Sequence, residues 1–278
     1  MRKIDDSTID RLANEPWYVS TRASQKERFA RCLKLIQAHG FSPRNAYDIG
    51  CANGQFSALL AGLGAKVTGF DINSGRIKDN RLNYVSTAGL DFRCEDFLTG
   101  EVDENAVDLI TALEVLYYFS HEQQQLFFQK AYETLQPQGR LLVSVNVFFS
   151  GHFSEESLLA LIDERFDRIA VDKIYRNFYY RFELPLIEWL DQIKYLEKLR
   201  LFSPNILRLD RKFYPGIWNR ILLRPSRFMD RYLLPGIRTI LLGLLESRLI
   251  YWGVTELTRI FSPAKGQSQM IILLEKPA

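Results

Sequence analysis

Three aspartates stand at or near the ends of three successive apolar segments in the first hundred residues. Asp48 precedes the turn GCANG, Asp71 ends VTGFD, and Asp96 ends FRCED. A carboxylate can accept both hydroxyl hydrogens of a ribose, which suits Asp71, or the amino hydrogens of an adenine, which suits Asp96 beside the ring of Phe97. Asp48 would suit a positively charged amino group. Together the three predict one aligned site for a nucleoside with a cationic end.

The turn after Asp48 contains Gly50 and Gly54, with Ala52 between them. Glycine lets backbone N–H groups approach a ligand closely. The dinucleotide fingerprint G-x-G-x-x-G expects glycine where Ala52 stands, and it needs room for a pyrophosphate. It does not call for Asp48 or Asp96, so a nicotinamide dinucleotide is the weaker prediction. A glycine turn without any ligand is the other alternative.

Apolar segments that alternate with amphipathic ones predict the elements that carry these residues. Strands are expected over 45–50, 66–72, 91–96, 106–116, 139–147, 168–175 and 267–277. Helices are expected over 25–39, 55–64, 74–86, 122–135 and 156–166. Strands that alternate with helices form a mostly parallel sheet covered on both faces. The predicted fold class is therefore a doubly wound α/β sheet, whose ligand binds at the carboxyl ends of the strands.

The order and spacing of five motifs resemble those of the class I S-adenosylmethionine-dependent methyltransferases: YDIGCANG, VTGFDIN, RCEDF, VDLITALEVLYYF and LQPQGRLLVSV. The resemblance covers residues 15–175 and 268–276. It implies a Rossmann-like methyltransferase fold of seven strands, with an antiparallel last strand, and S-adenosylmethionine as the cofactor. The cofactor-binding residues that it implies within the sheet region are Asp48, Gly50, Ala52, Gly54, Asp71, Ile72, Asp96, Phe97 and Glu114.

Two further stretches, GCANGQF and LEVLYYF, resemble the N-methyltransferases of nodulation-factor synthesis, which act on an aminosugar oligosaccharide. NEPWYVSTRASQKER resembles the segment that folds over the cofactor in such enzymes, and this implies cofactor contacts from Trp17, Tyr18 and Arg22. The implied function is methyl transfer to O or N of a small acceptor, a saccharide or lipid-linked saccharide. A lipid or other small amphipathic metabolite is the alternative acceptor, and a catalytically silent cofactor-binding scaffold is the alternative of another class.

Methyl transfer from a sulfonium is an in-line displacement, so the protein mainly aligns the nucleophile. A general base helps when that nucleophile is a hydroxyl or an ammonium. Glu114, Tyr117 and His121 follow the fourth predicted strand, and His152 follows the fifth. We predict that Glu114, His121 or His152 is the base, with Tyr117 as a further catalytic candidate. Packing for Tyr117, helix initiation for His121 and catalysis by alignment alone are the alternatives.

The chain divides into four predicted parts: an N-terminal helical segment over 1–40 that closes over the cofactor, a cofactor-binding core over 41–175, an insertion over 176–267 and a final strand over 268–278. The insertion is rich in aromatic and basic residues. Between positions 200 and 248 it holds ten basic and three acidic residues, a net charge of +7 against +3 for the whole chain. It reads as a substrate cap, as an element that contacts an anionic membrane surface, or as a helical subdomain that forms a homodimer contact. Nucleic acid is a disfavoured partner, because no RNA-binding module is recognisable.

The remaining sequence features bear on the compartment. Cys32, Cys51 and Cys94 show no metal-binding spacing, so they are expected to be reduced core thiols of a cytoplasmic protein, and no metal is expected. The N-terminus lacks the apolar core of a signal peptide. No charge-free apolar run approaches the roughly 18 residues that cross a bilayer. A peripheral position at the inner membrane face stays open because of the basic insertion.

Overall fold

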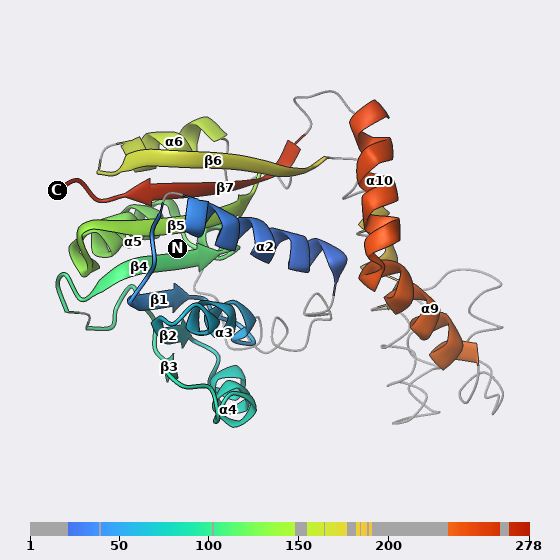
Figure 1. Ribbon diagram of the computed structural model, residues 1–278, viewed down its shortest axis with the longest axis horizontal. Coiled ribbons are helices and arrows are strands. Elements are labelled where there is room, and N and C mark those ends of the chain that lie inside the picture. The colour runs from blue at the N-terminus through green and yellow to red at the C-terminus, as the bar shows by residue number, and fades with distance from the viewer. Residues whose placement is uncertain are drawn as a thin grey trace, which may run out of the picture. The chain divides into compact units, whose positions relative to one another are not determined.

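The computed structural model describes residues 22–38, 40–101, 103–147, 155–163, 165–176, 182–183, 185–187, 189–190, 233–261 and 267–278. The chain forms two compact units (Figure 1). The first unit contains the described residues from 25 to 176 and from 267 to 278. The second contains residues 22–24 and the described residues between 182 and 261.

One seven-stranded sheet organises the first unit, in the order β3-β2-β1-β4-β5-β7-β6. Its strands are β1 (Asn45–Ile49), β2 (Lys66–Asp71), β3 (Leu90–Cys94), β4 (Val107–Leu113), β5 (Leu135–Asn146), β6 (Asp167–Arg176) and β7 (Gln267–Glu275). Neighbours from β3 to β5 pair in parallel, whereas β7 runs antiparallel to both β5 and β6. The predicted mostly parallel α/β sheet is confirmed, including its antiparallel last strand.

Helices pack on both faces of this sheet (Figure 1). They are α2 (Ala23–Ala38), α3 (Gln55–Gly62), α4 (Ser74–Asn83), α5 (His121–Thr134) and α6 (Glu155–Asp163). Side chains alternate across a strand, so Met270 and Ile272 of β7 join one core cluster and Ile271 joins the other. The first cluster includes Phe127 of α5, and the second includes Phe29 of α2. Both faces are therefore dry, as a doubly wound sheet requires.

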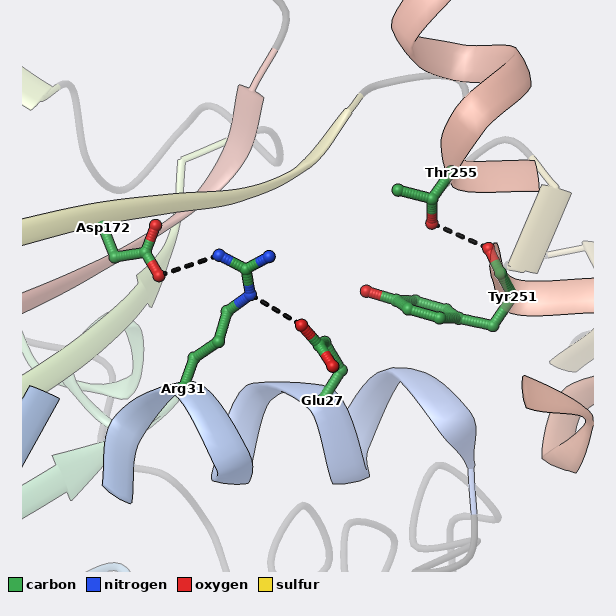
Figure 2. Close-up of polar contacts among 5 residues, drawn as sticks. All are labelled: Glu27, Arg31, Asp172, Tyr251 and Thr255. Carbon is green, nitrogen blue, oxygen red and sulfur yellow. Dashed lines mark hydrogen bonds and ion pairs between the residues drawn. The ribbon is translucent and has the colours of Figure 1, made fainter. Parts of the chain in front are cut away.

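Polar contacts tie α2 to the edge strand β6. Arg31 donates from Nη1 to Oδ2 of Asp172 on β6 at 3.0 Å and from Nε to Oε1 of Glu27, one turn earlier, at 2.8 Å (Figure 2). Each pair is partly exposed, so each contributes only about 0–1 kcal/mol to stability. Their effect is to set the rotation of α2, which carries Arg28 toward the site described below.

Two strand boundaries differ from the prediction by more than two residues. β4 ends at Leu113, before the predicted residue 116, because Glu114 takes a left-handed φ of 58° and Leu116–Tyr118 form the short 3-10 helix η2. β5 starts at Leu135, inside the predicted helix 122–135, because Leu135 already pairs with Val107 of β4. The first change matters for function, since it turns the chain sharply at the carboxyl end of a central strand.

Of the three cysteines, Cys32 and Cys51 are buried as predicted. Burial raises the pKa of the Cys32 thiol to about 12, which keeps it protonated. Cys94 is exposed, so the prediction of a core thiol is wrong there. The reason is topological, because Cys94 is the last residue of β3, and β3 is an edge strand of the sheet.

The second unit is described mainly by two helices, α9 (Leu234–Glu246) and α10 (Arg248–Phe261). Pro235 stands in the first turn of α9, where its missing N–H costs no hydrogen bond. Leu241 and Leu245 of α9 pack in one small core cluster with Ile187 and Leu190. No helix in the described part of the chain is long and apolar enough to cross a membrane.

Candidate active site

The loop between β1 and α3 contains three left-handed residues: φ is 69° at Gly50, 49° at Ala52 and 70° at Gly54. A Cβ on Gly54 would lie 2.6 Å from Cζ of Phe92, and a Cβ on Gly50 would lie 2.8 Å from Cγ2 of Val115. Both conformation and space therefore require glycine at these two positions. Ala52 accepts the same conformation at a cost of about 1–2 kcal/mol, so a methyl group fits where the dinucleotide fingerprint needs glycine.

Asp71, the last residue of β2, holds this loop in place. Its Oδ2 accepts the Ala52 N–H at 3.0 Å, and its Oδ1 accepts the Asn73 N–H at 2.9 Å. Asn80 of α4 donates from Nδ2 to the Ala52 carbonyl oxygen at 2.8 Å, which pins the loop from its other side. A carboxylate offers about four lone-pair sites, so Asp71 keeps the capacity to accept two ribose hydroxyls at the carboxyl end of β2.

Asp96 and Phe97, which follow β3, lie in different surroundings. Asp96 is exposed, as an adenine-binding carboxylate must be. The ring of Phe97 is only 3% exposed and packs in the core near Phe70 and Phe127, at centroid distances of 6.2 and 5.9 Å. Ile72 is 47% exposed directly after β2. The exposed apolar side chain available to a base is therefore that of Ile72, and contact of Phe97 with an adenine stays a prediction.

Asp48 is buried in β1, with 2% of its surface exposed. Its carboxylate accepts the hydroxyl hydrogens of Ser57 at 2.6 Å and Thr111 at 2.7 Å. Burial raises its pKa to about 6, and the two hydroxyl hydrogen bonds oppose that shift. Above this pH a negative charge lies next to the glycine loop, where it attracts a cationic group. Direct contact of Asp48 with the methionine part stays a prediction.

Glu114 directly follows β4 in a strained left-handed backbone, which costs on the order of 1–3 kcal/mol for a non-glycine residue. Its N–H donates to the Ser144 carbonyl oxygen at 2.9 Å. Its carboxylate Oε1 accepts the Ser144 hydroxyl at 2.9 Å and Nε2 of Gln269 at 2.5 Å, and Nη1 of Arg28 lies 3.8 Å away. Elements α2, β5 and β7 thus over-determine its position, which is typical of a functional residue.

The other base candidates are placed differently. Tyr117 packs against Tyr118 at a centroid distance of 4.5 Å, and burial raises its pKa well above the usual value. Its hydroxyl stays protonated at neutral pH and can donate a hydrogen bond. His121 is the exposed first residue of α5, whose capping box is formed by Ser120 and Gln123. His152 lies outside the described residues.

Of the three N-terminal residues predicted to contact the cofactor, Arg22 is described, and Trp17 and Tyr18 lie outside the described residues. Nη1 of Arg22 lies 3.4 Å from Oε1 of Glu183, a buried carboxylate that also accepts the Ser24 hydroxyl at 2.5 Å. This ion pair joins two parts of the second unit that are distant in sequence. A cofactor contact of Arg22 stays a prediction.

Sequence reasoning missed Arg28, Ser144 and Gln269, which surround Glu114. The sequence does contain a signal for two of them, a polar residue in an apolar strand. Ser144 lies within LLVSVN, and Gln269 begins QMIILL. A polar side chain in a strand buried on both faces needs a partner. Which partner it has follows from the strand order, because β7 lies beside β5 although more than a hundred residues separate them in the chain.

Comparison with known proteins connects this geometry to a family. Residues 47–143 match the family described as a methyltransferase domain. Nodulation protein S of Bradyrhizobium diazoefficiens is 30% identical over 105 residues, which are 38% of this chain and 49% of that protein. Nodulation protein S of Sinorhizobium fredii is 25% identical over 169 residues, which are 59% of this chain and 76% of that protein. The match therefore spans about half of the first relative and three quarters of the second.

Solved structures agree in fold. The N-methyltransferase NodS from Bradyrhizobium japonicum WM9, in complex with S-adenosyl-L-homocysteine, superposes with a TM-score of 0.54 and 22% sequence identity. The likeness covers 60% of this chain and 88% of that one. At this level of identity it shows the fold alone, and it confirms the predicted Rossmann-like methyltransferase architecture.

Proposed function

We propose that this chain, whose residues 47–143 form a methyltransferase domain, transfers a methyl group from S-adenosylmethionine to a small saccharide acceptor. The observation that carries the proposal is the left-handed glycine loop held by Asp71 at the carboxyl ends of β1 and β2. When bound, S-adenosylmethionine supplies a methyl group activated by its sulfonium. The chain's own residues bind that cofactor, orient the methyl acceptor and exclude water.

The residues at the sheet edge fit the two ends of this cofactor. Asp48 provides negative charge next to the loop, which suits the cationic amino acid end. Asp71 accepts the ribose hydroxyls, and exposed Ile72 packs against the nucleoside. Exposed Asp96 addresses the adenine amino group.

A saccharide amine is the acceptor that we favour. Similarity to two nodulation proteins S supports this choice, and Glu114 provides a partly buried carboxylate at the end of β4. Of the base candidates that the structure describes, Glu114 is the one that contacts from α2, β5 and β7 hold in place. A carboxylate there binds an ammonium and takes its proton, which an amine needs before it can act as a nucleophile.

The cofactor prediction can be tested at Asp71. In Asp71→Ala we expect the affinity for S-adenosylhomocysteine to fall about tenfold to a hundredfold, or about 1.4–3 kcal/mol, because the ribose loses its acceptor and Ala52 loses its restraint. Asp71→Asn keeps one acceptor oxygen and should lose less. Isothermal titration calorimetry measures both, with exposed Asp79→Ala on α4 as the control. A wild-type chain that binds no S-adenosylhomocysteine would contradict the enzyme and scaffold proposals alike, whereas binding without methyl transfer would favour the silent scaffold.

A second proposal concerns the surface of α10, and an exposed apolar face supports it. Leu249, Trp252 and Ile260 are 81%, 65% and 70% exposed, and their spacing places them on one side of the helix. Arg248 begins the same helix. Glu256, seven residues after Leu249, also lies on this side. We propose that the apolar side chains of this face enter the interface of an anionic membrane, which suits an enzyme whose acceptor saccharide is lipid-linked.

For this surface we expect wild-type protein to float with vesicles that contain phosphatidylserine, and to dissociate at high salt, because each basic residue contributes on the order of 1 kcal/mol. The double variant Leu249→Glu, Trp252→Glu should not float. Leu82→Glu, at a 66% exposed position of α4, is the matched control and should float like wild type. If wild type fails to float, the membrane proposal is wrong. A dimer that the double variant converts to monomer would assign the face to a second copy of the chain.

A further inference from the structure

Gln269 of β7 has a buried amide oxygen that lacks a donor. The residue is 1% exposed and pairs in the sheet with Asn146, at the carboxyl end of β5. Its Nε2 donates to Glu114, whereas its Oε1 has no hydrogen-bond partner within the described part of the chain. Leaving a buried acceptor unsatisfied costs about 1–3 kcal/mol. A structure that keeps such an atom at its ligand-binding edge points to a donor supplied by a ligand.

The orientation of this amide is fixed by charge. Glu114 is an acceptor when ionised, so the NH2 group of Gln269 must face it, at 2.5 Å. Turning the amide over would place its oxygen against a carboxylate oxygen. Oε1 of Gln269 is therefore held away from Glu114.

The two carboxylate oxygens of Glu114 also differ in their contacts. All its contacts among the described residues are made by Oε1, which is approached by Ser144, Gln269 and Arg28. Its Oε2 is left for a ligand. Two side chains joined by one short hydrogen bond thus present two acceptor atoms, Oε2 of Glu114 and Oε1 of Gln269, which we name the Glu114–Gln269 pair.

We propose that Gln269 is a substrate-binding residue, and that the Glu114–Gln269 pair binds a primary amine through two of its N–H groups. The inference rests on the proposed function and names the atoms that choose its substrate. A primary amine has two N–H bonds and one lone pair. When both N–H bonds donate to the pair, the lone pair is directed away from it and is free to attack. A hydroxyl has a single hydrogen and leaves one member of the pair unsatisfied, so the pair favours methylation on nitrogen over oxygen.

The proton balance follows from the same pair. An amine that arrives as an ammonium gives its third proton to Oε2 of Glu114, and Glu114 passes this proton to solvent before the methyl group moves, so that Oε2 again accepts an N–H bond. The new N–C bond forms as the C–S bond breaks, the bonding electrons stay on sulfur, and the positive charge passes from sulfur to nitrogen. One proton therefore leaves per methyl group transferred. Gln269 stays neutral throughout and acts only as an acceptor of hydrogen bonds.

The test uses two probes, a glucosamine oligosaccharide with one free amino group and its fully N-acetylated counterpart, which offers only hydroxyls and amides. Binding of each to the S-adenosylhomocysteine complex is measured by calorimetry, and methyl transfer is measured by mass spectrometry. We expect wild type to bind and methylate the free amine. In Gln269→Leu we expect affinity and turnover for that amine to fall at least about tenfold, with affinity for S-adenosylhomocysteine unchanged within about twofold.

Thr134→Val is the matched control, because Thr134 is fully buried and its hydroxyl donates to the Lys130 carbonyl oxygen at 2.7 Å, away from the pair. It should lose one buried hydrogen bond and keep both affinities. The inference is overturned if Gln269→Leu binds and methylates the amine as wild type does. It is equally overturned if Gln269→Leu loses S-adenosylhomocysteine affinity in parallel, since Gln269 would then have a structural role. A wild-type chain that binds S-adenosylhomocysteine but neither probe would instead contradict the acceptor class in the proposed function.

Discussion

Replacing Gly54 by alanine is expected to disable the cofactor loop and to lower the free energy of unfolding by about 2–5 kcal/mol. A left-handed backbone costs alanine about 1–2 kcal/mol, and Gly54 has a φ of 70°. The added Cβ would lie 2.6 Å from Cζ of Phe92 and 3.0 Å from Cε2 of Tyr84, and overpacking of this kind costs about 1–3 kcal/mol. Phe92 is 2% exposed and packs in a core cluster with Cys51 and Ile77, which opposes its displacement.

Chemical denaturation would measure the loss of stability, and calorimetry with S-adenosylhomocysteine would measure the loss of affinity, which we expect to exceed about tenfold. Gly62→Ala is the control within the same helix, because Gly62 ends α3 and no atom lies within 4 Å of the place that an added methyl group would occupy. That change should leave stability unaltered or raise it by up to about 1 kcal/mol. Equal behaviour of the two variants would refute the steric account of the loop.

Asp48→Asn is expected to change how stability depends on pH. Asp48 has a folded-state pKa of about 6 against an ordinary value of 3.8, because burial disfavours its charge. As pH rises from about 4 to 6, the unfolded chain ionises this group before the folded chain does, so the folded state loses stability over that window. Two pKa units, at about 1.4 kcal/mol each, correspond to about 3 kcal/mol. Asparagine removes the charge and therefore removes this loss.

The measurement compares free energies of unfolding of wild type and Asp48→Asn at pH 4 and pH 7.5. The difference between the two proteins should shift by about 2–3 kcal/mol in favour of the variant at the higher pH. Exposed Asp91→Asn on β3 controls for the general effect of removing a carboxylate, and its curve should run parallel to that of wild type. Parallel curves for Asp48→Asn would mean that Ser57 and Thr111 fully compensate the buried charge.

The sheet and the glycine loop after β1 were predictable because their signals are local. Apolar strands that alternate with helices determine a parallel sheet, and Asp71 at the end of its strand necessarily lies at the ligand edge. Gly50 and Gly54 were recognisable because left-handed turns favour glycine over other residues. The strand pattern, the aspartate at a strand end and the glycines in a turn each depend on one short segment and not on distant neighbours.

The surroundings of Glu114 were not predictable, since they depend on contacts between distant segments. Gln269 meets Glu114 across 155 residues of sequence, and Ser144 meets it across 30. The Gln269 contact requires that β7 enter the sheet beside β5, and the Ser144 contact requires that β5 pair with β4. Strand periodicity determines neither choice. Phe97 shows that a local signal can also mislead. Its position after β3 suggested contact with a ligand, whereas its ring packs near Phe70 and Phe127 in the core.

The pairing of Arg176 with Gln267 has an evolutionary consequence. These two residues are paired in the β6–β7 ladder. The two ends of the intervening segment therefore lie next to each other, because sheet pairing already holds them there. Lengthening such a loop is inexpensive, at about 0.6 kcal/mol per doubling. Whole segments can therefore be exchanged here by recombination while the glycine loop and the parallel strands are inherited unchanged. If the segment contacts the methyl acceptor as predicted, a lineage with this architecture would change its acceptor at this junction and keep the glycine loop constant.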